Sequence, residues 1–262
     1  MTSELSVTLD GPVLRLTLSR PDKRNALSRS LVTALHDAFR SLDGDSGTRV
    51  VVLAGDGPAF CAGGDIGEFV DAAGSGLAMA DAAGIADLLG EMTRCPAPIV
   101  TRIHGAAYGG GVGLVCAADV AIAAEGSRFS LSEARLGLVP AVISPWVFAS
   151  LGSRQGRALM LEAAPFGTET ALRCGLVHHC VPEVALDDAV EKVVKNLLQG
   201  APGALAAIKR LPATIDGFDP DAHRAATTAI LAERLASDEG QEGLRAFLEK
   251  RPPRWTPGDP PQ

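Results

Sequence analysis

The chain lacks the short motifs that mark several large enzyme classes. No lysine follows a glycine, so a Walker A phosphate loop is absent, and neither glycine-rich loop has G-x-G-x-x-G spacing. The sequence also has no G-x-S-x-G nucleophile elbow and no HExxH zinc motif. These absences argue against a P-loop NTPase, a dinucleotide-binding enzyme, an α/β-hydrolase and a zinc peptidase.

Basic residues are also scarce. The 262 residues carry a formal net charge of -7 and include only five lysines. No block of basic residues occurs, so the sequence predicts no nucleic-acid partner. We therefore expect an anionic ligand to be held mostly by arginine side chains and backbone amides.

The cysteine content and the chain ends indicate where the protein resides. The five cysteines form no CxxC pair, which favours free thiols in a reducing compartment and no metal site. The N-terminus has no signal-peptide pattern, and no apolar run reaches membrane-spanning length. We expect a cytoplasmic protein that does not interact with membranes.

Hydrophobic patterning predicts an α/β fold. Alternating apolar residues at 7–9 and 13–18 flank Asp10-Gly11, which is typical of a hairpin. Apolar strands are expected at 50–54, 99–103 and 120–123, with helices at 28–42, 78–93 and 112–118 around them. This order predicts a parallel sheet with right-handed crossovers. Further helices are expected between 145 and 173 and from 186 to 250, with a short strand at 177–181.

Two glycine-rich loops follow predicted strands, at residues 55–66 and 105–111. Because the carboxyl ends of parallel strands share one edge of the sheet, we expect both loops to meet there. Backbone amides from the two loops could then hold one carbonyl oxygen that becomes negative during a reaction. The alternative is a tight turn with close packing of helix and strand.

Glu133 follows the apolar residues Phe129 and Leu131 and could face the same edge. A glutamate in an apolar pocket has a raised pKa, which suits proton transfer near neutral pH. The alternative is a surface ion pair with the nearby Arg135.

At these residues the chain resembles the enoyl-CoA hydratase/isomerase (crotonase) superfamily. The resemblance covers nearly the whole chain and includes seven motifs in the family's order, at residues 20–27, 60–66, 104–111, 118–119, 132–140, 175–177 and 246–252. It implies an α/β spiral of β-β-α turns at residues 1–195 and a helical C-terminal trimerisation region at 196–262. It further implies a homotrimer or homohexamer that binds acyl-CoA thioesters, with no cofactor beyond the CoA of the substrate.

The resemblance also implies roles for individual residues. Glu133 matches the catalytic glutamate, and the amides of Gly64 and Gly110 match the oxyanion-binding pair. Arg24 lies where the family often places a basic residue against the CoA phosphates. The loop at 62–66 matches the part that meets the adenine and pantetheine of CoA. The substrate-binding residues implied are Arg24, Ala26, Ala62, Gly64, Asp65, Ile66, Gly110 and Gly113.

One departure from the family pattern limits the reaction. Well-known hydratases carry a second glutamate, which falls at Gly113 in this chain. The string from Ser132 to Pro145 and the glycine at 113 are most similar to a single-glutamate branch described as hydratases of branched or carboxylated enoyl-CoAs. We expect an enoyl-CoA hydratase. The alternatives are a Δ3-Δ2 enoyl-CoA isomerase and a non-catalytic acyl-CoA-binding homologue. We also expect residues 72–79 and Trp146 to form part of the pocket wall.

Overall fold

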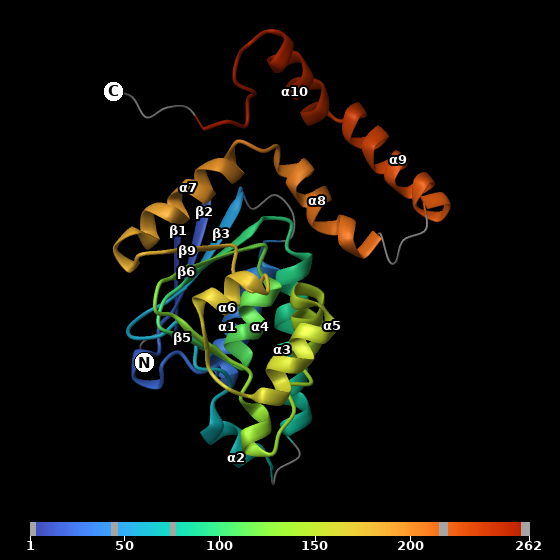
Figure 1. Ribbon diagram of the computed structural model, residues 1–262. Coiled ribbons are helices and arrows are strands. Elements are labelled where there is room, and N and C mark those ends of the chain that lie inside the picture. Colours follow the sequence, from blue (N-terminus) through green and yellow to red (C-terminus); the bar gives the residue numbers. More distant parts are fainter. Residues whose placement is uncertain (1–3, 43–46, 74–76, 215–219, 258–262) are drawn as a thin grey trace.

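The computed structural model describes residues 4–42, 47–73, 77–214 and 220–257 (Figure 1). At its centre is a six-stranded sheet with the order β1-β2-β3-β4-β6-β9. β1 and β2 form the predicted antiparallel hairpin, and every other neighbouring pair is parallel. The strands are β1 (Leu5–Asp10), β2 (Val13–Leu18), β3 (Val50–Gly55), β4 (Ile99–Ile103), β6 (Val120–Ala124) and β9 (His179–Val181). The predicted parallel α/β sheet is therefore confirmed.

Alternate residues of the central strands belong to two separate hydrophobic clusters. On β3, Val51 and Leu53 pack in a cluster with α1 (Arg29–Arg40), α3 (Ala78–Arg94) and α4 (Gly110–Ala117). Val50 and Val52 pack in the other cluster, with α7 (Leu186–Leu198). Figure 1 shows these helices on opposite sides of the sheet. Since side chains alternate between the faces of a strand, burial on both sides requires a continuous apolar run.

A smaller, three-stranded sheet contains one strand from each of three successive parts of the chain. Its order is β5-β7-β8, with β5 (Ala106–Tyr108), β7 (Arg128–Ser130) and β8 (Phe166–Gly167). β4 runs on into β5 and then α4, and β6 runs on into β7 and then the 3-10 helix η2 (Glu133–Leu136) and α5 (Ser144–Glu162). This repeated strand–strand–helix order is the expected crotonase-like spiral of β-β-α turns. The second sheet itself was not predicted, because strands of two or three residues show no periodicity.

Two helical segments differ from the expected pattern. Within the region 145–173, where the sequence predicts separate short helices, the first two, at 145–151 and 154–161, are the two halves of α5, which meet at Gly152, where φ is +73°. A helix not expected from the sequence, α2 (Ile66–Ala73), follows the first glycine loop. In the described part of the chain, every helix is too short or too polar to cross a bilayer.

The C-terminal region contains α8 (Pro202–Thr214), α9 (Pro220–Ala236) and α10 (Asp238–Leu248). Lys209 on α8 donates hydrogen bonds from Nζ to the Asp119 carboxylate (2.6 Å) and to the Ala97 carbonyl (3.0 Å), which ties this helix to the sheet. α9 and α10 extend away from the sheet (Figure 1). The boundary expected between residues 195 and 196 falls inside α7, and the division into core and C-terminal region stays a prediction.

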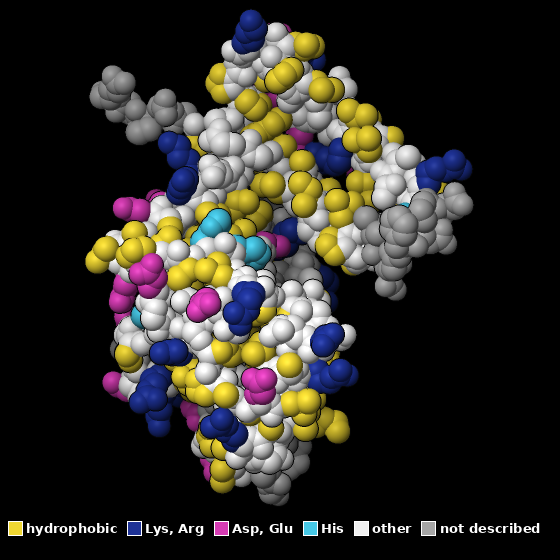
Figure 2. Space-filling model, in the orientation of Figure 1, with side chains coloured by type: hydrophobic (Ala, Val, Ile, Leu, Met, Phe, Trp, Pro, Cys, Tyr) yellow, Lys and Arg dark blue, Asp and Glu magenta, His cyan; other side chains and the backbone are white. Residues whose placement is uncertain are grey.

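We call α9 and α10 the C-terminal arm. The arm carries an exposed apolar surface, which is visible in Figure 2. Its exposed large hydrophobic residues are Leu231, Leu235, Leu244, Phe247 and Leu248. The end of the arm is folded back by Glu242, which accepts two hydrogen bonds from the Arg251 guanidinium (2.7 and 3.0 Å). The hydrogen bond from Arg251 lowers the pKa of Glu242 to about 2.

Candidate active site

The two glycine-rich loops meet at the carboxyl end of the parallel strands. Cys61 in the first loop pairs with Ala107 on β5, and its carbonyl accepts a hydrogen bond from the Tyr108 amide (2.9 Å). The other side of the loop is held by Leu27, whose amide donates to the Gly63 carbonyl (2.7 Å). A Cβ built on Gly110 in the second loop would lie only 3.7 Å from the Gly64 amide nitrogen. The main chains of the two loops are therefore in near contact.

The backbone amides of Gly64 and Gly110 are both available to a ligand. Within the described residues, neither N–H donates a hydrogen bond, and both glycines line the same cavity. Gly110 is the first residue of α4, where an N–H has no partner inside the helix and the helix dipole adds positive potential. Two free donors beside one cavity can bind an oxygen atom that gains negative charge.

Glu133 lies directly across from the second glycine loop. Its Oε1 would be 2.9 Å from a Cβ at residue 109, so the carboxylate lies against the bare backbone of Gly109. Gly109 has φ +46° and ψ -114°, a conformation that side-chain-bearing residues rarely adopt. Glycine at 109 is thus required both by the backbone and by the neighbouring carboxylate.

The surroundings of Glu133 favour its protonated form. Its Oε2 is buried and has no hydrogen-bond partner among the described residues. Burial raises the pKa of the Glu133 carboxyl, and the hydrogen bond from its own amide opposes only part of that shift. In the described chain, Arg135 forms no ion pair with Glu133. The alternative of a surface ion pair is therefore not what the structure contains.

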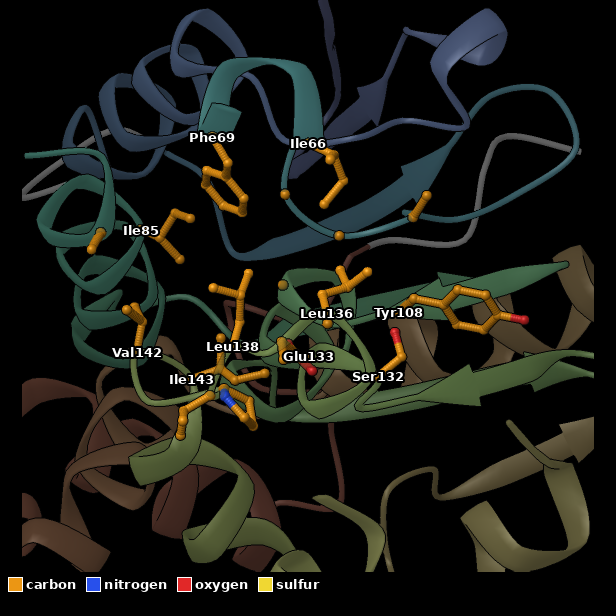
Figure 3. A pocket seen from close by; sticks show the side chains of 18 residues that line it. Ile66, Phe69, Ile85, Tyr108, Ser132, Glu133, Leu136, Leu138, Val142 and Ile143 are labelled. Carbon is orange, nitrogen blue, oxygen red and sulfur yellow. The ribbon is translucent and has the colours of Figure 1, made fainter. Parts of the chain in front are cut away.

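The cavity beside Glu133 has a volume of about 370 Å³ and is mostly apolar (Figure 3). Among the described residues that line it, Glu133 is the only charged side chain, and Tyr108 and Ser132 are the only other polar ones. Its apolar side chains come from α2, α3 and the segment after Glu133, and the largest are Ile66, Phe69, Ile85, Leu136, Leu138, Val142 and Ile143.

Position 113 does not line the cavity, which differs from the expectation for Gly113 as a substrate-binding residue. A Cβ at residue 113 would lie 2.7 Å from Cγ2 of Ile143 and 3.4 Å from Cδ1 of Leu89. Ile143 fills the space next to the glycine and is itself part of the cavity wall. The position to which the family resemblance assigns a second carboxylate is thus in an apolar contact.

Some residues of the loop at 62–66 line the cavity, and Asp65 in the same loop makes structural hydrogen bonds. Ala62 and Ile66 line the cavity along with Gly64. The Asp65 carboxylate instead accepts hydrogen bonds from Arg20 Nη2 (3.0 Å) and from the Gly67 amide (3.1 Å). Burial acts to raise the pKa of Asp65, but the Arg20 hydrogen bond and charge outweigh it and lower the pKa. Asp65 therefore positions the start of α2 and does not face the cavity.

Three other predicted site residues lie outside the cavity. Arg24 is exposed, with φ +49°, and its carbonyl accepts a hydrogen bond from the Ala62 amide (2.9 Å). The Ala26 carbonyl accepts a hydrogen bond from Arg20. The Trp146 indole N–H donates to Thr93 Oγ1 (2.8 Å), which directs this ring toward α3 and away from the cavity. The expected wall at 72–79 lies in part outside the described residues; Ala82 is the nearest following residue in the lining.

Sequence reasoning missed the residues that shape the apolar end of the cavity. These are Phe69 on α2, Ile85 on α3, and Ile143 just before α5. The spacing of Ile66 and Phe69, three residues apart, is a helical signal that could have indicated α2. Ile143 has no such signal, because its contact with Gly113 joins distant parts of the chain.

Comparisons with known proteins agree with this fold. The family model described as "Enoyl-CoA hydratase/isomerase" matches residues 9–258. A Rhodobacter capsulatus protein named "Probable enoyl-CoA hydratase" is 35% identical over 245 residues, covering 92% of this chain and 93% of that protein.

Solved structures lead to the same class. Pseudomonas aeruginosa AtuE superimposes with a TM-score of 0.92 at 38% identity, covering 97% of this chain and 100% of that one. An enoyl-CoA hydratase from Shewanella pealeana gives a TM-score of 0.90 at 35% identity and 96% coverage of both chains. The protein is a crotonase-fold protein, and it belongs to the enoyl-CoA hydratase/isomerase family. Placement in the branch for branched or carboxylated substrates stays a prediction.

Proposed function

We propose that the protein hydrates 2-enoyl-CoA thioesters, with Glu133 as the proton-transfer group and the amides of Gly64 and Gly110 as the oxyanion hole. The observation that carries the proposal is the convergence of two unpartnered amides and one buried carboxylate oxygen on a single cavity. Family membership supports an acyl-CoA substrate.

In the proposed reaction, Glu133 first accepts a proton from water and then donates it to the substrate. The Glu133 carboxylate takes a proton from water as the water oxygen bonds to C3 of the enoyl group. The C2–C3 double-bond electrons shift toward the thioester, whose carbonyl oxygen becomes an enolate oxygen held by the two amides. Glu133 then returns the proton to C2, which gives the 3-hydroxyacyl thioester. Each oxyanion donor contributes on the order of 3 kcal/mol to lowering such a barrier.

Glu133 suits this double role because its pKa is raised. A carboxyl with a pKa nearer to neutrality is a better base than an ordinary glutamate and still a usable acid after it takes the proton. Among the described residues that line the cavity there is no second carboxylate to hold the water, and Ile143 occupies the space beside Gly113. In this proposal Glu133 holds the water, since its Oε2 has no hydrogen-bond partner among the described residues.

The lining supports a neutral, hydrocarbon acyl group. No lysine or arginine is among the described residues that line the cavity, so a substrate carboxylate would lose its hydration without gaining a cationic partner. Apolar enoyl groups, straight or branched, are the expected substrates, and carboxylated ones such as 3-methylglutaconyl-CoA are the disfavoured class. CoA itself lies along Ala62 and Ile66 in this proposal, with Arg24 near its phosphates.

The test is loss of enoyl absorbance when the protein is mixed with crotonyl-CoA and with 3-methylglutaconyl-CoA. The expected result is hydration of crotonyl-CoA and at least about tenfold lower kcat/KM for the carboxylated substrate. Formation of the 3-hydroxyacyl product is checked by mass spectrometry. Tight CoA-thioester binding without turnover of any enoyl substrate would instead support a non-catalytic acyl-CoA-binding protein.

Double-bond isomerisation is the second candidate, because it needs only one carboxylate beside the oxyanion hole. Glu133 would remove a proton from C2 of a 3-enoyl-CoA and return it to C4, with the same two amides holding the enolate oxygen. A 3-enoyl-CoA that becomes a 2-enoyl-CoA, with no 3-hydroxyacyl product on prolonged incubation, would favour isomerisation over hydration.

Assembly into a homotrimer or homohexamer is part of the proposal. The exposed apolar residues of α9 and α10, including Phe247, supply a surface that a second copy could bury. Light scattering after size exclusion should give three or six times the 27.0 kDa chain mass. The reaction uses no cofactor beyond the substrate's CoA, and a cytoplasmic location stays a prediction.

A further inference from the structure

A second cavity, of about 220 Å³, lies between α1, α2 and α3. It shares two lining side chains with the active-site cavity, Phe69 and Ile85. Leu27, Val32 and Gly84 line the second cavity and not the first. One layer of side chains therefore separates the two cavities, and we call this layer, Phe69 with Ile85, the partition.

Phe69 is the part of the partition that lies closest to the chemistry. In Figure 3, Phe69 from α2 and Ile85 from α3 point toward one another at the end of the cavity away from Glu133. A Cβ at residue 64 would lie 2.3 Å from Cζ of Phe69, so the ring rests on the bare backbone of Gly64. The ring thus adjoins the oxyanion loop on one side and the second cavity on the other.

The polar groups of the second cavity already have partners. The Arg29 guanidinium donates to both carboxylate oxygens of Asp81 (2.6 and 2.8 Å), and the Arg29 amide donates to Glu68 (2.8 Å). Ser28 and Thr33 also line this cavity, and their hydroxyls donate to the Glu4 carboxylate and to the Arg29 carbonyl (2.9 Å). The apolar surface left to a ligand is Leu27, Val32, Ala80 and the partition. Hydrocarbon is the chemistry that fits such a surface.

We propose that Phe69 sets the upper limit of acyl-chain length by closing the active-site cavity against the second cavity. The proposal rests on the acyl-thioester function proposed above and adds the residue that determines specificity. Removing the ring joins the two cavities and lets a longer hydrocarbon chain continue between α1 and α3. Each further methylene that becomes buried raises affinity by about three- to fourfold.

The test compares four proteins: the parent, Phe69→Ala, Gly84→Leu and the double variant. Gly84 lines only the second cavity, and a Cβ there would meet nothing closer than Val32 Cγ1 at 3.7 Å, so a leucine can fill that space. Calorimetry with saturated butyryl-, octanoyl- and dodecanoyl-CoA measures affinity without requiring turnover. We expect Phe69→Ala to raise the dodecanoyl-to-butyryl affinity ratio by at least about tenfold. Gly84→Leu alone should leave the ratio unchanged, and the double variant should return it to the parent value.

Two results would overturn the proposal. One is an unchanged affinity ratio in Phe69→Ala, and the other is a raised ratio that persists when Gly84→Leu fills the second cavity. If Phe69→Ala does not fold, Phe69→Leu replaces it and should raise the ratio by about threefold. The proposed reaction fails separately, by absence of enoyl-CoA hydration in the parent, while the chain-length shift in binding would still hold.

Discussion

The two ends of the active-site cavity are built from different parts of the chain. The end beside Glu133 is largely main chain, supplied by Gly64, Gly109 and Gly110. The other end is side chain, supplied mainly by Phe69 and Ile85, and the two parts meet where the Phe69 ring rests on Gly64. In the proposed reaction, the path of the backbone therefore determines the catalytic geometry, and exchangeable side chains determine which acyl group fits. Changes at one end should alter rates, and changes at the other should alter fit or stability.

The largest expected effect is on the rate when Glu133 becomes glutamine. Glu133→Gln keeps the shape of the side chain and removes its ability to take a proton, so kcat for crotonyl-CoA should fall by about 100- to 10,000-fold. Calorimetric affinity for butyryl-CoA should stay within about threefold of the parent, because the amides and the apolar wall are untouched. An activity equal to the parent's would exclude Glu133 from the reaction.

The next largest effect is expected on kcat when Gly109, whose backbone lies against the Glu133 carboxylate, is replaced by alanine. Gly109→Ala places a Cβ 2.9 Å from Glu133 Oε1 at a position with φ +46°, so we expect kcat to fall by about 10- to 100-fold. Gly126→Ala is the matched control, since Gly126 also has positive φ (+85°) but has nothing within 4 Å of the added Cβ. It should lose about 1 kcal/mol of stability and keep its kcat. Equal kcat losses in both variants would mean that backbone strain alone is responsible.

A smaller effect is expected where Ile143 packs on residue 113, and it should appear in stability. Gly113→Ala brings a Cβ to 2.7 Å from Ile143 Cγ2 and should cost about 1–3 kcal/mol, more than alanine gains over glycine in a helix. Ile143→Ala should cost about 2–5 kcal/mol through the cavity it leaves. Denaturant unfolding of the double variant should show a total cost below the sum of the two, because the new methyl group occupies part of that cavity. Strict additivity would contradict the contact.

The smallest effect is a trend of stability with pH. The folded protein holds a proton on Glu133 more tightly than the unfolded chain does, because the pKa is raised by burial. Stability from this group is therefore fully present below the ordinary glutamate pKa and is lost as pH rises through the raised value. Glu133→Gln lacks the titration, so its Tm minus the parent's should increase between pH 4 and pH 8. A Tm difference that stays constant or shrinks over this range would mean that the pKa of the Glu133 carboxyl is not raised.

The polar end of the cavity could be predicted from the sequence because its signals are local. Runs of glycine after apolar strands mark where backbone approaches backbone, and Glu133 follows an apolar step of only a few residues. The topology of a parallel sheet then brings both loops to one edge. These local signals predict that the two loops and Glu133 lie at one edge, whereas the choice of Gly64 and Gly110 within the loops came from the family resemblance.

The apolar end could not be predicted for the opposite reason. Whether Ile143 fills the space at Gly113, or Trp146 turns toward Thr93, depends on how α5 packs against α3 and α4. No local sequence pattern predicts that packing. Asp65 shows the same limit: its position in the loop suggested a substrate contact, whereas the structure pairs it with Arg20, which is 45 residues away in sequence.

The two amides at residues 64 and 110 belong to the main chain, so no substitution other than proline can delete either N–H. Descendants of this scaffold can exchange every side chain around the cavity and still inherit both donors, provided the chain keeps its course. The carboxylate and the cavity walls are free to change, whereas the proposed oxyanion-binding pair is inherited with the fold.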